Sequence, residues 1–200
     1  EDFSDLEPLR DQLRGVRVVL LGEADHGDGA DFAAKTRLVK FLHRRMGFDV
    51  LAFESGLFGT STTWRAMETG SEPLDAFRRY VWRAWGLSEQ LEPLVRYLGA
   101  SARSGQPLEL SGFDMQFQEA AEARAFLSSL RQFIVRIGIA SVLADSTSTQ
   151  SQVLAGVLDG RFMRDPRQLP QVAEQVALIE SLRGAAALVE RTDVPRREKT

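Results

Sequence analysis

The sequence predicts an α/β protein with a central, mainly parallel sheet flanked by helices. Three short runs, at 16–22, 48–54 and 107–114, have the apolar, β-branched composition of buried strands. Segments with helical spacing separate these runs, and strands that alternate with helices are typical of parallel sheets. We therefore expect one α/β domain over residues 1–200.

The first run, VRVVLLG, does not alternate apolar and polar residues, which indicates a strand covered on both faces. A glycine-rich loop over 27–31 follows it. Apolar side chains then recur at helical spacing from Phe32 to Met46, and Gly47 gives a stop. Residues 138–170 show no clear pattern and are expected to be irregular. Further helices are expected at 62–69, 73–82, 88–102, 117–137 and 169–191.

Composition limits the classes of partner. The net charge is −3 and acidic residues are interleaved with the arginines, which argues against nucleic-acid binding. No apolar run approaches the ~20 residues of a membrane span. The chain has no cysteine, which excludes disulfides, thiolate metal sites and a cysteine nucleophile.

We expect a small-molecule ligand. The sequence assigns no oligomeric state, and for the compartment we favour the cytoplasm, although an export signal could precede Glu1.

The three expected strands all lead to carboxylates, at Glu23, Glu54 and Asp114. Ligands of open parallel sheets bind beyond the carboxyl ends of the strands. We therefore expect these groups to meet around one hollow. Glu54 has an alternative role in a salt bridge with an arginine, and Asp114 could equally cap the helix that follows it.

His26 is the strongest candidate for chemistry. It lies among glycines directly after the first expected strand, and an imidazole titrates near neutral pH, as a general base requires. Glu23, Asp25 or Glu54 would orient the ring. The alternative is an ordinary loop histidine. The second histidine, His43, lies within a basic helix and is expected to be structural or exposed.

Lys35 and Arg37 lie in the first turns of the next expected helix. They could bind an anionic group or stabilise an oxyanion, while a solvated helix face is the alternative for both. Trp64, Trp82 and Trp85 are expected in the core or in a pocket wall, with Trp85 as a candidate for substrate contact.

Other hydrolytic motifs do not occur. The segment GEADHGDG lacks the lysine and the spacing of a phosphate-binding loop, and GTSTT is not the G-x-S-x-G turn of serine esterases. Water activated by His26 is the simplest scheme that is left.

Four stretches together resemble the N-terminal half of the erythromycin esterase family: LGEADHGDG, KTRLVKFLHRRMGFDVLAFESG, WGLSEQLEPLVRYL and LSGFDMQ. The resemblance covers about residues 13–130. It implies an α/β fold with a central sheet in a protein about twice this length, with RREKT leading into the second half.

The resemblance also implies an activity. Family members of the antibiotic-resistance type hydrolyse the lactone ester of macrolides, with a histidine as general base on water and no covalent serine intermediate. The base matches His26, and the acidic positions match Glu23 and Glu54. The basic residue of the following helix falls on Lys35, where the resistance enzymes have arginine, and the two differ in bidentate geometry.

Two further departures from the family pattern stand out. Asp25 occupies a position where the commoner motif has alanine or threonine. The family also has active-site histidines in its C-terminal half, whereas this chain has none after His43.

Three functions follow as hypotheses. The first is a carboxylic ester hydrolase without a cofactor, in which His26 activates water, Glu23 and Glu54 orient it, and Lys35 assists the oxyanion. The second is a hydrolase assisted by a divalent metal ion bound by Glu23, His26, Glu54 and Asp114. The third is a binding domain that keeps the pocket without turnover.

Overall fold

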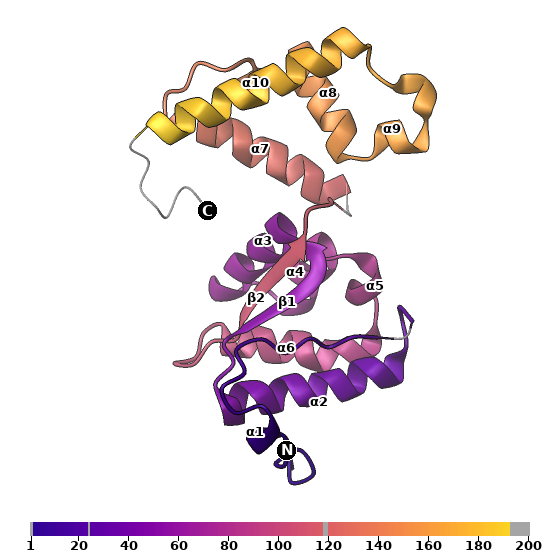
Figure 1. Ribbon diagram of the computed structural model, residues 1–200, viewed down its shortest axis with the longest axis vertical. Helices are drawn as coiled ribbons and strands as arrows, with labels where there is room; N and C mark the ends of the chain where they lie inside the picture. The colour runs from indigo at the N-terminus through magenta and orange to yellow at the C-terminus, as the bar shows by residue number, and fades with distance from the viewer. Residues whose placement is uncertain (1, 24, 118–119, 193–200) are drawn as a thin grey trace. The chain divides into compact units, whose positions relative to one another are not determined.

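The computed structural model describes residues 2–23, 25–117 and 120–192. The chain forms two compact units, Glu1–Glu119 and Ala120–Thr200, where the sequence suggested one domain. The first unit is mixed α/β and the second is helical (Figure 1). The first unit contains α1 (Leu9–Gln12), α2 (Gly29–Met46), β1 (Val50–Gly56), α3 (Leu57–Glu68), α4 (Pro73–Tyr80), α5 (Arg83–Gly86), the 3₁₀ helix η1 (Glu89–Leu91), α6 (Glu92–Ser101) and β2 (Glu109–Asp114).

Helix α2 begins three residues before the expected start. The side chain of Asp28 accepts a hydrogen bond from the N–H of Ala30 (2.8 Å) and so caps the first turn. Gly47 ends the helix with φ of 76°, a left-handed conformation that glycine adopts without steric cost. Phe32 and Val39 face the main core, which fixes how the helix packs.

The sheet is parallel, as predicted, and consists of two strands within the described residues. Val50 pairs with Glu109 and the register continues to Phe53 and Gly112, after which it shifts. A Cβ at Gly112 would lie 2.4 Å from the backbone oxygen of Ser55, so only glycine allows the strands to approach this closely.

The prediction of a strand at 16–22 is wrong. These residues are assigned to no strand in the structure. The side chains of Val18 and Leu20 are 71% and 89% exposed, while those of Val19 and Leu21 are half-buried against the unit. An apolar run predicts burial, but a strand also needs a neighbour that pairs with its backbone, and none is present in the described part of the chain.

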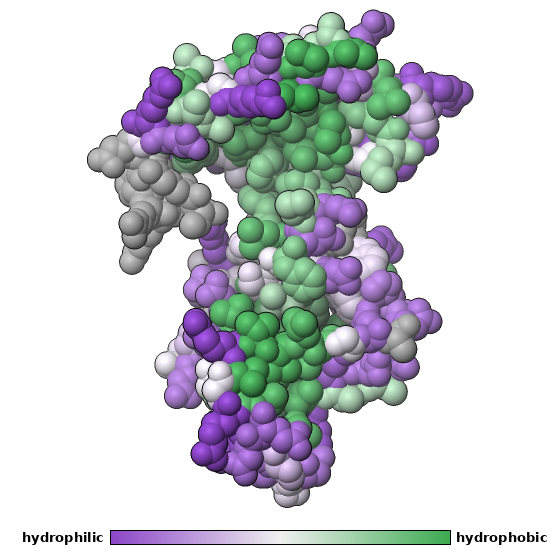
Figure 2. All heavy atoms as spheres, in the orientation of Figure 1, coloured by the Kyte–Doolittle hydropathy of each residue, from purple (hydrophilic) through white to green (hydrophobic). Residues whose placement is uncertain are grey.

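The main core lies between the sheet and the helices of the first unit. Leu110, Leu98 and Phe77 are almost fully buried in it. The other face of the sheet is open: Val50 and Phe113 are 51% and 66% exposed. Figure 2 shows apolar side chains gathered over the strands of this unit.

The second unit packs its own core, which includes Leu127, Ile134, Leu154 and Leu178. The stretch 138–170, expected to be irregular, contains α8, whose first turn is capped by Ser148. Among the described residues, no helix of either unit is long and apolar enough to cross a membrane. The elements of this unit are α7 (Ala120–Arg136), η2 (Val142–Ala144), α8 (Thr149–Leu158), α9 (Arg161–Arg164), η3 (Pro166–Gln168) and α10 (Val172–Arg191).

Candidate functional site

His26 lies in the loop between the extended segment 16–22 and α2. Gly27 follows it with φ of 96°, which turns the chain sharply, and Asp28 then caps α2. The His26 side chain is 50% exposed. The loop therefore presents the imidazole at the surface beside the first turns of α2.

A carboxylate and an ammonium group hold one side of the ring. His26 Nδ1 is hydrogen-bonded to Oε1 of Glu23, and Oε2 of Glu23 accepts a hydrogen bond from Lys35 Nζ at 3.1 Å. Only 12% of the Glu23 side chain and 20% of the Lys35 side chain are exposed. A carboxylate on Nδ1 favours the tautomer with the proton on that nitrogen, which leaves Nε2 as an acceptor.

Two tryptophans contact the same imidazole. The centroids of the His26 and Trp82 rings are 5.1 Å apart at an interplanar angle of 83°, and those of His26 and Trp85 are 5.8 Å apart at 89°. Trp82 and Trp85 are also perpendicular, with centroids 5.8 Å apart. These are edge-to-face contacts of the kind that aromatic rings prefer.

The tryptophans connect His26 to the end of β1. The indole N–H of Trp85 donates to the backbone oxygen of Glu54 at 3.0 Å, and the backbone N–H of Trp82 donates to Ser55 Oγ at 3.1 Å. Ser55 is fully buried. The carboxyl end of β1 is thus connected to the imidazole through backbone and aromatic groups, and not through the strand-end carboxylate that the sequence suggested.

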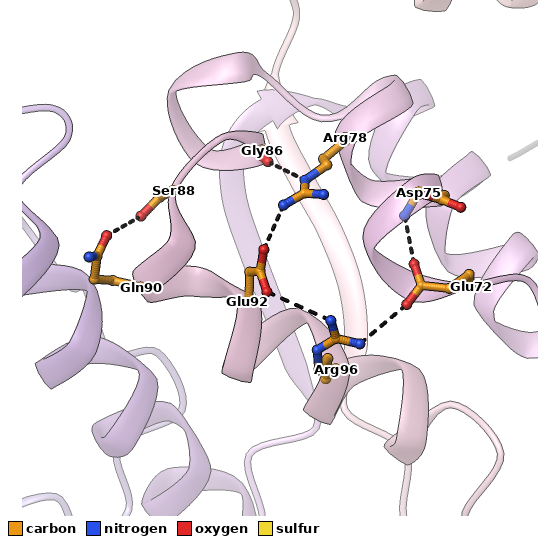
Figure 3. Close-up of polar contacts among 8 residues, drawn as sticks. All are labelled: Glu72, Asp75, Arg78, Gly86, Ser88, Gln90, Glu92 and Arg96. Atoms are coloured by element: carbon orange, nitrogen blue, oxygen red, sulfur yellow. Dashed lines mark hydrogen bonds and ion pairs between the residues drawn. The ribbon is translucent and has the colours of Figure 1, made fainter.

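A polar network holds the turn that carries the tryptophans (Figure 3). Arg78 of α4 donates to the backbone oxygen of Gly86 (3.3 Å) and to Glu92 (2.6 Å). Arg96 continues the network from Glu92 to Glu72, the capping residue of α4. Because Gly86 directly follows Trp85, these bonds fix the turn against α4 and α6.

The remaining acidic candidates are not gathered at the imidazole. Glu54 is exposed, and its carboxylate has no hydrogen bond or ion pair within residues 2–23, 25–117 and 120–192. Asp25 is exposed in the loop. Asp114 accepts a hydrogen bond from the N–H of Gln116 at 2.9 Å, so it stabilises the turn after β2. The helix that it was expected to cap does not begin there, because α7 starts at Ala120.

Arg37 lies apart from the site. Its guanidinium forms an ion pair with Asp5 and donates to the backbone oxygen of Asp2 at 2.7 Å. It thereby ties α2 to the N-terminal segment, where the sequence had suggested a contact with an anionic ligand. Lys35, two residues earlier on α2, is the cation that reaches Glu23.

The donors proposed for a divalent metal do not come together. No group of three or more histidine, aspartate or glutamate side chains that could hold a metal ion occurs in the described part of the chain. Glu23 and His26 are adjacent, but they are already hydrogen-bonded to each other.

His43 is structural, in keeping with its expected place in the helix. Its Nδ1 lies 2.5 Å from the hydroxyl of Tyr97 on α6, and the two rings meet edge to face. Burial lowers the pKa of the His43 imidazole below its ordinary value of 6.5, because the charged form loses hydration.

Sequence reasoning placed Trp82 in the core or a pocket wall without a contact to His26, and it did not single out Ser55 or Arg78. Trp82 and Trp85 are three residues apart, a spacing that places two side chains on one side of a helical turn, and this was the available signal. The roles of Ser55 and Arg78 depend on contacts 27 and 8 residues along the chain, which no local pattern contains.

Comparisons with known proteins show one sequence relative and one solved structure with a similar fold. No known family profile matches the sequence. A protein of Bacillus subtilis (strain 168) that carries the name "Putative hydrolase YbfO" is 38% identical over 112 residues, which make up 56% of this chain and 25% of YbfO.

A crystal structure of a Bacillus cereus protein has a similar fold, with a TM-score of 0.70 and 19% identity. The match covers 96% of this chain and 44% of that protein, and at this identity it establishes a shared fold alone. The chain therefore spans less than half the length of each relative.

Proposed function

We propose that this chain carries the general-base part of a hydrolase site that cleaves an ester or lactone with water activated by His26. The observation that carries the proposal is the relay of Lys35, Glu23 and His26, joined by two hydrogen bonds. The similarity to YbfO supports a hydrolase function in general. The ester or lactone class, with macrolides as a member, rests on the family resemblance of the sequence.

The chemistry follows from the ring's hydrogen bonding. With the Nδ1 proton donated to Glu23, Nε2 accepts a proton from a water molecule as the water oxygen attacks the substrate carbonyl. The tetrahedral intermediate then collapses, and the imidazolium returns its proton to the departing alkoxide. The products are a carboxylic acid and an alcohol, and His26 regains its neutral form.

Glu23 has two tasks in this scheme. Its carboxylate orients the imidazole and stabilises the imidazolium that forms during the reaction. Lys35 binds the second carboxylate oxygen, which keeps the Glu23 carboxylate pointed at the ring. Lys35 therefore acts in this proposal through Glu23, in place of the direct oxyanion contact that the sequence suggested.

The test compares the two histidines of the chain. The full chain is assayed against p-nitrophenyl acetate, p-nitrophenyl butyrate and a macrolide lactone, beside His26→Ala and the matched control His43→Gln. Removal of a general base costs about 10²–10⁴-fold in rate. We expect this loss in His26→Ala alone, and a rate that persists in EDTA.

Equal rates in the wild-type chain and His26→Ala would contradict the proposal. If substrate still bound with equal affinity to both, the result would favour a binding domain without turnover. A rate abolished by EDTA and restored by a divalent ion would favour the metal-assisted scheme.

A further inference from the structure

The three rings at the site pack too closely to enclose a ligand. A cage of aromatic rings holds its ligand between the ring faces, whereas these centroids are 5.1–5.8 Å apart, which is direct edge-to-face contact. The two indoles therefore support the imidazole.

We propose that Trp82 is a positioning residue that, with Trp85, fixes the orientation of the His26 ring. The inference rests on the proposed function, because it assigns the direction in which Nε2 meets the reacting water. A single hydrogen bond at Nδ1 leaves the imidazole free to tilt about that bond. Two perpendicular ring contacts remove this freedom.

Residues at the end of β1 hold the two tryptophans in place. Ser55 is fully buried and binds the backbone N–H of Trp82, while the backbone oxygen of Glu54 binds the indole of Trp85. From the other side, Arg78 holds the carbonyl of Gly86. The turn 82–86 is thus held at both ends. Because its two tryptophans contact His26, the turn also holds the loop around Gly27 in place relative to β1.

Trp82 is the informative residue of the pair. Trp85 is buried and contacts Phe32 and Phe53 in the core, so its removal would disturb packing. Trp82 is half-buried. Its ring can be changed with less effect on the core.

The first measurement needs no substrate. Nitrogen NMR of the imidazole in the full chain reports which ring nitrogen of His26 carries the proton, and proton NOEs report its contact with residue 82. We expect one tautomer, protonated at Nδ1, in the wild type and in Trp82→Phe. Trp82→Leu keeps apolar volume but removes the aromatic ring. In this variant we expect Glu23 to keep the proton on Nδ1, while the NOEs between the His26 ring and Trp85 weaken as the imidazole tilts. Leu87→Ala, on the same turn and 60% exposed in the wild type, is the matched control.

The second measurement is kinetic, with p-nitrophenyl butyrate as the probe. Misplacement of a catalytic group by about 1 Å costs up to about 100-fold, so we expect kcat of Trp82→Leu to fall about 10- to 100-fold. KM should change by less than about twofold, because a positioning residue does not bind the ground state. Trp82→Phe should recover most of the lost kcat.

The outcomes separate the two proposals. Unchanged NOEs between His26 and Trp85 together with an unchanged kcat in Trp82→Leu, or a rise in KM alone, would overturn the positioning role. If the wild-type chain does not hydrolyse the probe, the proposed function fails and the NMR result alone decides the inference. Circular dichroism checks folding, and Trp82→Met replaces Trp82→Leu if the latter does not fold.

Discussion

Substitution of Gly99 by alanine should destabilise the first unit. Gly99 lies in α6, where the helix crosses the start of α4, and a Cβ there would lie 2.1 Å from Cγ and 2.8 Å from Cβ of Pro73. Carbon atoms in contact prefer about 3.5–4.0 Å, so the helices must separate by about 1.4 Å. The proline ring cannot rotate away, because it is closed on its own backbone.

The magnitude follows from two opposing effects. Overpacking of a well-packed core costs about 1–3 kcal/mol, and the rigid contact at Pro73 places Gly99→Ala at the upper end. Alanine in a helix gains back about 1 kcal/mol relative to glycine. We therefore expect a net loss of about 2 kcal/mol in the free energy of unfolding.

The assay is urea unfolding followed by circular dichroism. Gly105→Ala is the matched control, because a Cβ at Gly105 meets no atom within 4 Å and its φ is not positive. This variant should be neutral or slightly more stable than the wild type. The double variant Pro73→Ala/Gly99→Ala should recover about 1 kcal/mol, since it removes the nearest clashing atom, Cγ, while Cβ of residue 73 remains. Equal stability of Gly99→Ala and Gly105→Ala would refute the reasoning.

Three further predictions concern the site and the core. Glu23→Gln should reduce the rate of hydrolysis about 10²–10³-fold. This loss is smaller than the ~10⁴-fold loss for a buried triad carboxylate, because His26 is half-exposed and water partly substitutes for the lost group. An unchanged kcat would exclude the relay of Lys35, Glu23 and His26. Acidification from about pH 7.5 to pH 5.5 should lower the stability to urea, because the pKa of His43 is lowered in the folded state and the unfolded state binds its proton first. His43→Gln should remove that part of the pH dependence, so a parallel decline in both proteins would count against it. Leu98→Ala should cost about 2–5 kcal/mol of unfolding free energy, because Leu98 is 0% exposed in the main core and leaves a cavity; a loss below about 1 kcal/mol would mean that the core collapses around it.

The helices were the most predictable part of the fold. Periodicity and terminal residues located α2, α4, α6, α7 and α10 within a few residues. Capping explains the remaining shift of α2, since the carboxylate of Asp28 allows the helix to begin before its first apolar residue. The same local chemistry, at Ser148, produces α8 in a stretch without apolar periodicity.

The sheet and the site were only partly predictable, for a physical reason. The run at 16–22 has strand composition, yet pairing depends on a second segment that composition does not identify. Glu23, His26 and Lys35 were predicted to lie together because they follow an apolar run and lie near the start of the next helix, and hydrogen bonds join them although that run forms no strand. Trp82 contacts His26 through its ring and donates its backbone N–H to the hydroxyl of Ser55, and such long-range contacts leave no mark on the local sequence.

The uncovered face of the two-stranded sheet also determines how the chain behaves in concentrated solution. Val50 and Phe113 present aliphatic and aromatic carbon to water, and among the described residues each strand has one outer edge with no strand beside it. Association between molecules removes both kinds of surface from water. The purified chain should therefore form reversible multimers whose population grows with protein concentration, and the folded state should bind a hydrophobic dye that multimer formation displaces.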